Sequence, residues 1–153
     1  MSDAFADSIV SERLKTVYAV WKEQTTNAIG AQRDDITPAK LRGAMPWTFL
    51  IEAQPTDFRF AFAGERIQEF MGTRLLGQQL STLLGNHYFA GMNRFFRACA
   101  DNKRPLHREA HRSTYPGKEH FDIEVIVMPL SSDGETVSHI LGAFDTWRAG
   151  THT

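Results

Sequence analysis

The sequence predicts one α+β domain, in which a five-stranded antiparallel sheet has its helices collected on one side. Three observations support this class. The chain has 153 residues, a length that favours a single core. Large apolar residues recur at every second position in residues 58–62 and 121–127, whereas those in residues 5–21 recur at steps of three and four. The predicted order is helix, two strands, three helices and three strands.

The first element is an amphipathic helix over residues 4–24. It carries one broad apolar stripe, formed by Phe5, Ile9, Val10, Leu14, Val17, Tyr18 and Trp21. Such a stripe packs on the chain's own sheet or on a second copy of the chain. We expect Leu14, Val17 and Trp21 to form a homodimer interface, because the stripe is wider than one small sheet edge needs. Residues 1–30 are therefore predicted to be a dimerisation cap and residues 31–149 the domain proper.

A short helix and a hairpin follow. Thr37 and Pro38 are typical of a helix start, and Pro46 ends that helix near residue 43. Residues 47–53 and 58–64 are predicted strands joined by a turn at 54–57. Alternation in the second strand predicts that Phe58, Phe60 and Phe62 share one face.

The middle third is helical. Two short helices over 65–72 and 75–85 each end at a glycine suited to a C-terminal cap. A longer helix is expected from residue 87 to about 101, capped by Asn86. Its inner face would carry Phe89, Met92, Phe96 and Cys99.

The last third is predicted to hold three strands, at 106–115, 121–130 and 137–147. Pro116-Gly117 favours a type II turn between the first two, and Asp133-Gly134 favours a hairpin between the last two. A two-residue loop at Pro116-Gly117 places His111 opposite Asp122. The same register puts Arg108 and Arg112 on one face with the apolar residues of strand 121–130.

Composition excludes several classes of function. The net charge is −1 with both signs interspersed, so we expect no nucleic-acid partner. No apolar run approaches the roughly 18 residues of a membrane span. The first residues lack the charge and apolar pattern of a secretory signal, and the one cysteine, Cys99, fits a reducing compartment. We therefore expect a cytoplasmic protein.

Short motifs occur in a fixed order along nearly the whole chain. Their residues are Trp21, Arg33, Asp35–Pro38, Leu41, Met45, Pro46, Asp57–Phe60, Gly64, Phe70–Gly72, Leu76, Gly77, Met128–Leu130 and Ile140–Gly142. In this order they resemble the PAS fold, and in particular a family of short bacterial PAS-like domains with a Trp-containing N-terminal helix and a D-I-x-P element. The resemblance implies a sheet in the order 2-1-5-4-3, with short helices that close a ligand cavity. It also implies a sensory or protein-interaction module in bacterial signalling, acting through a partner signalling protein that the sequence does not identify.

A small ligand, apolar or anionic, is expected between the sheet and the short helices. The candidate apolar contacts are Phe60, Phe62, Ile67, Phe70, Leu80, Phe89, Met92 and Phe96. Arg108 is a candidate contact for an anionic group if its face of the sheet lines the cavity. We favour the alternative, in which Arg108 and Arg112 reach solvent on the outer face.

We expect no metal site, and the sequence identifies no cofactor. His107 and His111 have a ligand-like spacing, but on a strand they lie about 13 Å apart, too far to share one ion. His87, at the start of the long helix, is the candidate haem ligand, although we expect it at the surface. Cys99 is expected to be buried and does not fit a flavin-adduct motif.

Catalysis is not expected, because the chain has neither a nucleophile motif nor a phosphate-binding glycine loop. Two alternatives remain open. One is a small enzyme of the isomerase or dehydratase type, which needs an Asp-His pair inside a closed cavity. The other is a structural adaptor whose phenylalanines fill the core and leave no cavity.

Overall fold

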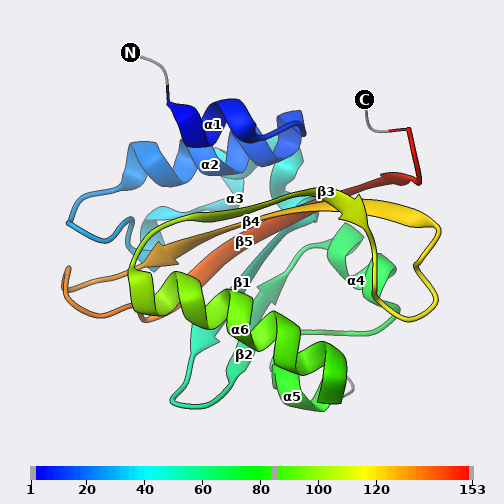
Figure 1. Cartoon of the computed structure of the whole chain (residues 1–153). Helices are drawn as coiled ribbons and strands as arrows, with labels where there is room; N and C mark the ends of the chain where they lie inside the picture. Colours follow the sequence, from blue (N-terminus) through cyan, green and yellow to red (C-terminus); the bar gives the residue numbers. More distant parts are fainter. Residues whose placement is uncertain (1–2, 84–85, 152–153) are drawn as a thin grey trace.

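Five antiparallel strands form one sheet in the order β2-β1-β5-β4-β3, as predicted (Figure 1). The computed structural model describes residues 3–83 and 86–151, without the side chains of 86–89. The strands are β1 Thr48–Ala53, β2 Phe58–Ala63, β3 Leu106–Arg112, β4 Phe121–Leu130 and β5 His139–Arg148. The helices are α1 Ala4–Ser8, α2 Glu12–Gln24, α3 Pro38–Leu41, α4 Glu65–Met71, α5 Leu80–Leu83 and α6 Asn86–Asn102, with 3-10 turns η1 Arg33–Asp35 and η2 Arg42–Trp47.

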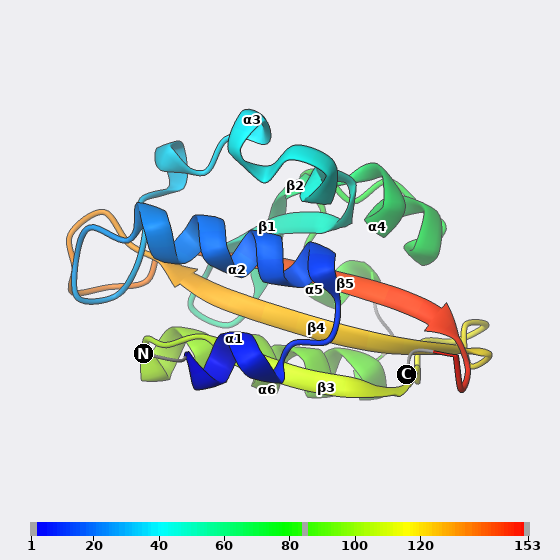
Figure 2. The same ribbon diagram turned by 90° about the horizontal axis from the view of Figure 1, so that it is seen from above.

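Helices cover both faces of the sheet. Helices α4, α5 and α6 lie on one face, which we name the cavity face, and α1, α2 and α3 lie on the other, the outer face (Figure 2). The prediction of helices on one side therefore holds for α4–α6. The N-terminal helix takes the first of its two expected positions, across the chain's own sheet.

Strand β4 separates two apolar cores, and it is buried along nearly its whole length. Ile123, Val125 and Val127 join the core of the cavity face, whereas Ile126 and Met128 join that of the outer face. A strand covered on both sides needs apolar residues at successive positions, because successive side chains point to opposite faces. This explains the run VIVMPL at the end of β4.

The predicted N-terminal helix is two helices. Ser11 caps the N-terminus of α2, and its hydroxyl oxygen accepts a hydrogen bond from the N–H of Leu14 at 3.2 Å. The backbone N–H groups of Val10 and Ser11 instead donate to the Glu124 carboxylate. Because these two donors point at the sheet, the helical pattern is interrupted at residues 9–11.

The predicted interface residues lie inside the molecule. Leu14 and Val17 are 0% exposed and Trp21 is 7% exposed, all within the outer-face core. The Trp21 Nε1–H donates to the Pro129 carbonyl at 2.8 Å, and a Cβ at Gly30 would lie 2.8 Å from that nitrogen. The structure corrects their assignment to a partner surface, since a partner could reach them only by opening this packing.

A bulge in the β1–β2 pair turns Phe62 away from the other two phenylalanines of its strand. Ile51 pairs with Phe60, but Leu50 pairs with Phe62, so one residue of β2 is extra. Phe58 and Phe60 stay in the cavity-face core, whereas Phe62 lines a hollow on the outer face. The prediction that all three rings share one face is therefore wrong for Phe62.

A second bulge changes the predicted register of β3. Arg108 pairs with Val125, and after the bulge His111 pairs with Ile123 and Arg112 with Asp122. His111 therefore lies on the same face as Arg108, and not opposite Asp122 as predicted. Arg112 moves to the outer face, where its Nε lies 3.3 Å from the Asp122 carboxylate. The prediction that both arginines share one face is wrong.

Candidate ligand cavity

A cavity of about 550 Å³ lies between the cavity face of the sheet and helices α4, α5 and α6. Its size is within the range of small-molecule sites. The space argues against the filled-core alternative, because the phenylalanines leave room under the sheet. Its lining residues are Phe49, Phe60, Ile67, Phe70, Met71, Leu80, Ala90, Gly91, Met92, Arg94, Phe95, Phe96, Arg108, His111, Thr114, Ile123, Val125 and Phe144.

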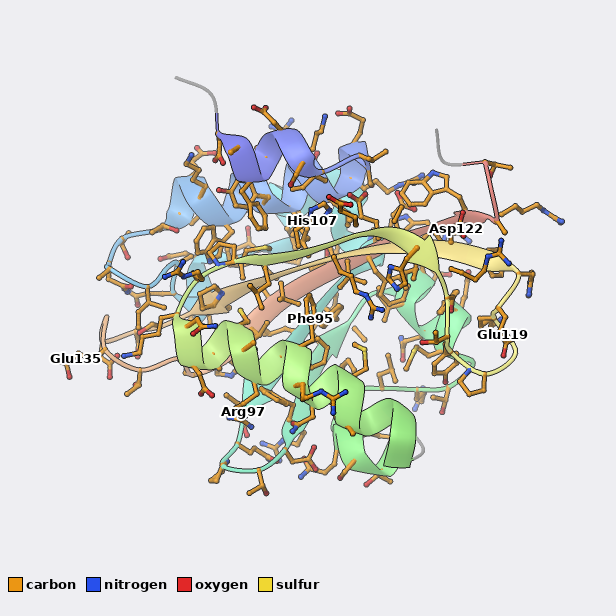
Figure 3. The ribbon with its side chains drawn as sticks, viewed as in Figure 1. Phe95, Arg97, His107, Glu119, Asp122 and Glu135 are labelled. Atoms are coloured by element: carbon orange, nitrogen blue, oxygen red, sulfur yellow. The ribbon has the colours of Figure 1, made fainter. Side chains whose placement is uncertain are left out.

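Six phenylalanine rings form a large part of the apolar wall. The Phe49 ring centroid lies 5.9 Å from that of Phe96 and 6.5 Å from that of Phe144. Phe95 projects from α6 into the space between this helix and the sheet (Figure 3). Phe49 also explains a glycine on β5, since a Cβ at Gly142 would lie 2.2 Å from its ring. These packed rings present a pre-formed apolar surface to a ligand.

The polar part of the lining comes from α6, β3 and the segment after β3. Arg94 and Arg108 are exposed, and among the residues that the structure describes neither guanidinium has a hydrogen-bond or ion-pair partner. His111 Nδ1 lies 2.8 Å from the Glu109 carbonyl oxygen and donates to it. None of the described lining residues is an aspartate or glutamate, so the charged side chains at the polar end of the described lining are cationic.

The pKa of His111 is lower than its ordinary value. Burial is the largest cause, because it disfavours the charged ring, and the neighbouring Arg108 guanidinium acts in the same direction. The hydrogen bond to the Glu109 carbonyl and the Asp122 carboxylate oppose the shift without reversing it. The imidazole at the cavity is therefore neutral at pH 7.

The structure brings seven of the nine predicted ligand contacts together around this cavity: Phe60, Ile67, Phe70, Leu80, Met92, Phe96 and Arg108. Phe62 lies on the opposite face of the sheet. The predicted contact Phe89 lies outside the described side chains.

Sequence reasoning missed Phe49, Phe144, Arg94 and His111. Phe144 could have been predicted from the sequence, because the alternation of side chains along β5 places it on the cavity face once the pairing with β4 is assigned. His111 was not, because its position depends on the bulge.

The outer face carries a separate cluster of polar groups under residues 8–11. The two Glu124 carboxylate oxygens accept hydrogen bonds from the N–H groups of Val10 and Ser11, each at 2.9 Å. His107 Nε2 lies 2.7 Å from the Glu124 carboxylate, and its Nδ1 lies 3.0 Å from the Ser8 hydroxyl. Figure 3 shows His107 on the side of the sheet that faces α1 and α2.

Glu124 is fully buried, yet its pKa lies below the ordinary value. Burial alone raises the pKa of this carboxyl, but the hydrogen bonds from His107, Val10 and Ser11 outweigh it. Asp145 lies directly opposite Glu124 on β5, and its carboxylate accepts hydrogen bonds from the Ser11 hydroxyl at 2.7 Å and from Arg13 at 3.2 Å. Each of these two adjacent buried carboxylates thus has its own hydrogen-bond donors.

This cluster bears on the enzyme alternative. That alternative requires a histidine and a carboxylate in hydrogen-bond contact inside a closed cavity. His107 and Glu124 are in contact, but they lie on the outer face, covered by residues 8–11, and neither lines the ligand cavity. The pair therefore does not meet the condition.

The structure also bears on the metal and cofactor candidates. His107 and His111 lie on opposite faces of β3, and the described residues contain no group of three His, Cys, Asp or Glu side chains placed to hold a metal ion. Cys99 is 0% exposed, and burial raises the pKa of its thiol to about 12. The side chain of the haem candidate His87 lies outside the described residues.

Comparison with known proteins gives one consistent fold. A family model described as PAS domain matches residues 9–145, a region that includes α2. The PAS domain of Bordetella pertussis BvgS has a TM-score of 0.54 at 14% identity, covering 69% of this chain and 79% of that one. An RsLOV variant has a TM-score of 0.50 at 15% identity, covering 94% and 73% respectively.

The Rhodobacter sphaeroides LOV protein has a TM-score of 0.49 at 18% identity, covering 68% of this chain and 59% of its own length. No curated protein matches the chain.

Proposed function

Because the chain belongs to the PAS domain family, whose members are typically sensory and signalling modules, we propose that it senses a small ligand held between the sheet and helices α4–α6. The observation that carries this proposal is the aromatic cavity of about 550 Å³. Transfer of an apolar ligand from water into this cavity is favourable, because it buries apolar surface of both the ligand and the protein. A signalling partner would then bind the ligand-bound and ligand-free forms of the domain with different affinities.

Titration with N-phenylnaphthylamine tests the proposal. This neutral apolar dye fluoresces strongly only when it leaves water, and we expect saturable binding with one site per chain. Met92→Trp places a larger ring in the cavity and should abolish the signal, because Met92 lines the space and is only partly buried. Ser132→Trp, at an exposed loop position, is the matched control and should leave binding unchanged.

Absence of saturable binding in the wild-type chain would contradict the proposal. Binding that persists unchanged in Met92→Trp would also contradict it, because the dye would then occupy another place.

We further propose that the module works in the bacterial cytoplasm through a partner protein or a second copy. No helix in residues 3–83 or 86–151 is long and apolar enough to cross a bilayer. A homodimer through α2 would use its exposed side, with Glu12, Ala19 and Glu23, because the apolar stripe is occupied. Light scattering at high micromolar concentration tests this, and a monomer would exclude the homodimer.

A further inference from the structure

We propose that the cavity selects an apolar organic acid, with its carboxylate held by Arg94 and Arg108 and its apolar body among the phenylalanines. The inference rests on the proposed function and adds the chemical class of the ligand. It starts from two guanidinium groups that lie at an apolar cavity without an acidic partner in the described part of the chain.

The first argument is charge. Arg94 comes from α6 and Arg108 from β3, and both line the same cavity. Neither has a hydrogen-bond or ion-pair partner in the part of the chain that the structure describes. Arg112, four residues further along β3, shows the other outcome, since it meets Asp122 on the outer face at 3.3 Å. Arg112 is therefore paired with an acid of the chain, whereas Arg108 is available to bind an anion from outside.

The second argument is position. In a regular strand, residues three apart such as Arg108 and His111 point to opposite faces. The bulge in β3 adds one residue between them and so places both on the cavity face. Guanidinium groups bind carboxylates through charge-assisted hydrogen bonds, which are stronger than those between neutral groups. Among the described lining residues no carboxylate competes for these donors, so an incoming acid meets only cations and neutral groups.

The third argument concerns His111. Its Nδ1–H is engaged by the Glu109 carbonyl, which leaves Nε2 without a partner among the described residues. Burial lowers the pKa of the ring most; of the two charged groups around it, Arg108 on β3 lowers this pKa further and Asp122 on β4 opposes that shift without reversing it. A carboxylate bound beside it favours protonation of the ring. Binding of the acid therefore takes up a proton, and affinity should increase as the pH falls from 8 to 6.

Competition between matched ligands tests the class. Decanoate and decanol have the same apolar chain and differ in the head group, and each is titrated against bound N-phenylnaphthylamine. The difference between them measures the contribution of the charge. Charge-assisted hydrogen bonds contribute about 1.5–3 kcal/mol, so decanoate should displace the dye at a concentration roughly tenfold lower than decanol, or lower still.

Variants locate the head group. In the double variant Arg94→Gln and Arg108→Gln, the advantage of decanoate should fall below about threefold while decanol is unaffected, because most of the charge-assisted binding is lost. Arg112→Gln is the matched control on the same strand and should keep the full advantage. In His111→Gln the advantage should remain but lose its increase between pH 8 and pH 6.

Three results would overturn the inference: equal displacement by the two ligands, an advantage that survives in the double variant, or an advantage that Arg112→Gln removes. Failure of the proposed function is a different result, in which neither decanol nor the dye binds the wild-type chain. Because Arg94 and Arg108 are exposed and unpaired among the described residues, the double variant should fold, and its decanol binding verifies this.

Discussion

The two faces of the sheet differ in whether their charged side chains are paired within the chain. On the outer face, the carboxylates of Glu124 and Asp145 are buried side by side, and each is matched by donors from residues 8–13. On the cavity face, Arg94 and Arg108 border an apolar space whose described lining contains no acid. The buried carboxylates of the outer face are paired within the chain, whereas these two arginines have no acidic partner among the described residues. The comparison supports a structural role for the first face and agrees with the ligand site that we propose on the second.

Replacing Glu124 with alanine should have the largest effect on stability. The change leaves His107 and the Val10 and Ser11 N–H groups buried without their acceptor. Breaking a buried pair by removing one partner costs about 3–5 kcal/mol, and we expect the free energy of unfolding to fall by that amount. Chemical denaturation measures it.

Glu52→Ala is the matched control, since Glu52 pairs with Arg59 on an exposed part of the sheet. It should cost at most about 1 kcal/mol. Equal losses in the two variants would remove the distinction between a structural outer face and the rest of the surface.

Two isoleucines on β4 compare the faces with the same substitution. Ile126 is 0% exposed in the outer-face core, whereas Ile123 lines the cavity. Ile126→Ala should cost about 2–5 kcal/mol, because it opens a hole in close-packed surroundings. Ile123→Ala should cost at least about 1 kcal/mol less, since one side of Ile123 already faces open space. A larger loss for Ile123→Ala in denaturant titrations would contradict the assignment of the two faces.

The outer face should also respond to acid. The pKa of Glu124 is lowered in the folded chain, so its contribution to stability is complete above the ordinary carboxyl pKa. That contribution is lost as the pH falls through the lowered value. The stability gap between the wild type and Glu124→Gln should therefore narrow from pH 6 to pH 3. The pKa of Asp3 is lowered to about 2 by Lys22 and Tyr18. Asp3 titrates in both proteins, so its effect on stability cancels in the difference between them. A constant gap would show that Glu124 is not charged in the fold.

Much of the fold followed from the sequence. Alternation and the turns at Gly117 and Gly134 gave the strands, and the motif order gave the sheet topology. Both main errors in the strands came from bulges. In β2 the alternation of phenylalanines continues through the bulge, so nothing in the residues themselves marks the change of face at Phe62.

The apolar part of the cavity was predicted better than its polar part. Ile67, Phe70 and Phe96 could be assigned because burial of a helix stripe depends only on helical periodicity. His111 depends on a bulge in β3, and Arg94 depends on how α6 is rotated over the sheet. Both are tertiary choices that a single sequence does not specify.

The most direct test of the central claim is a methyl NMR titration with decanoate that follows Ile123 and Ile126. They are three residues apart on β4, but Ile123 lines the cavity and Ile126 lies in the outer-face core. We predict a saturable shift of the Ile123 methyl resonances while those of Ile126 move little. A larger shift at Ile126, or no shift at Ile123 at saturating decanoate, would contradict the assignment of the ligand to the cavity face.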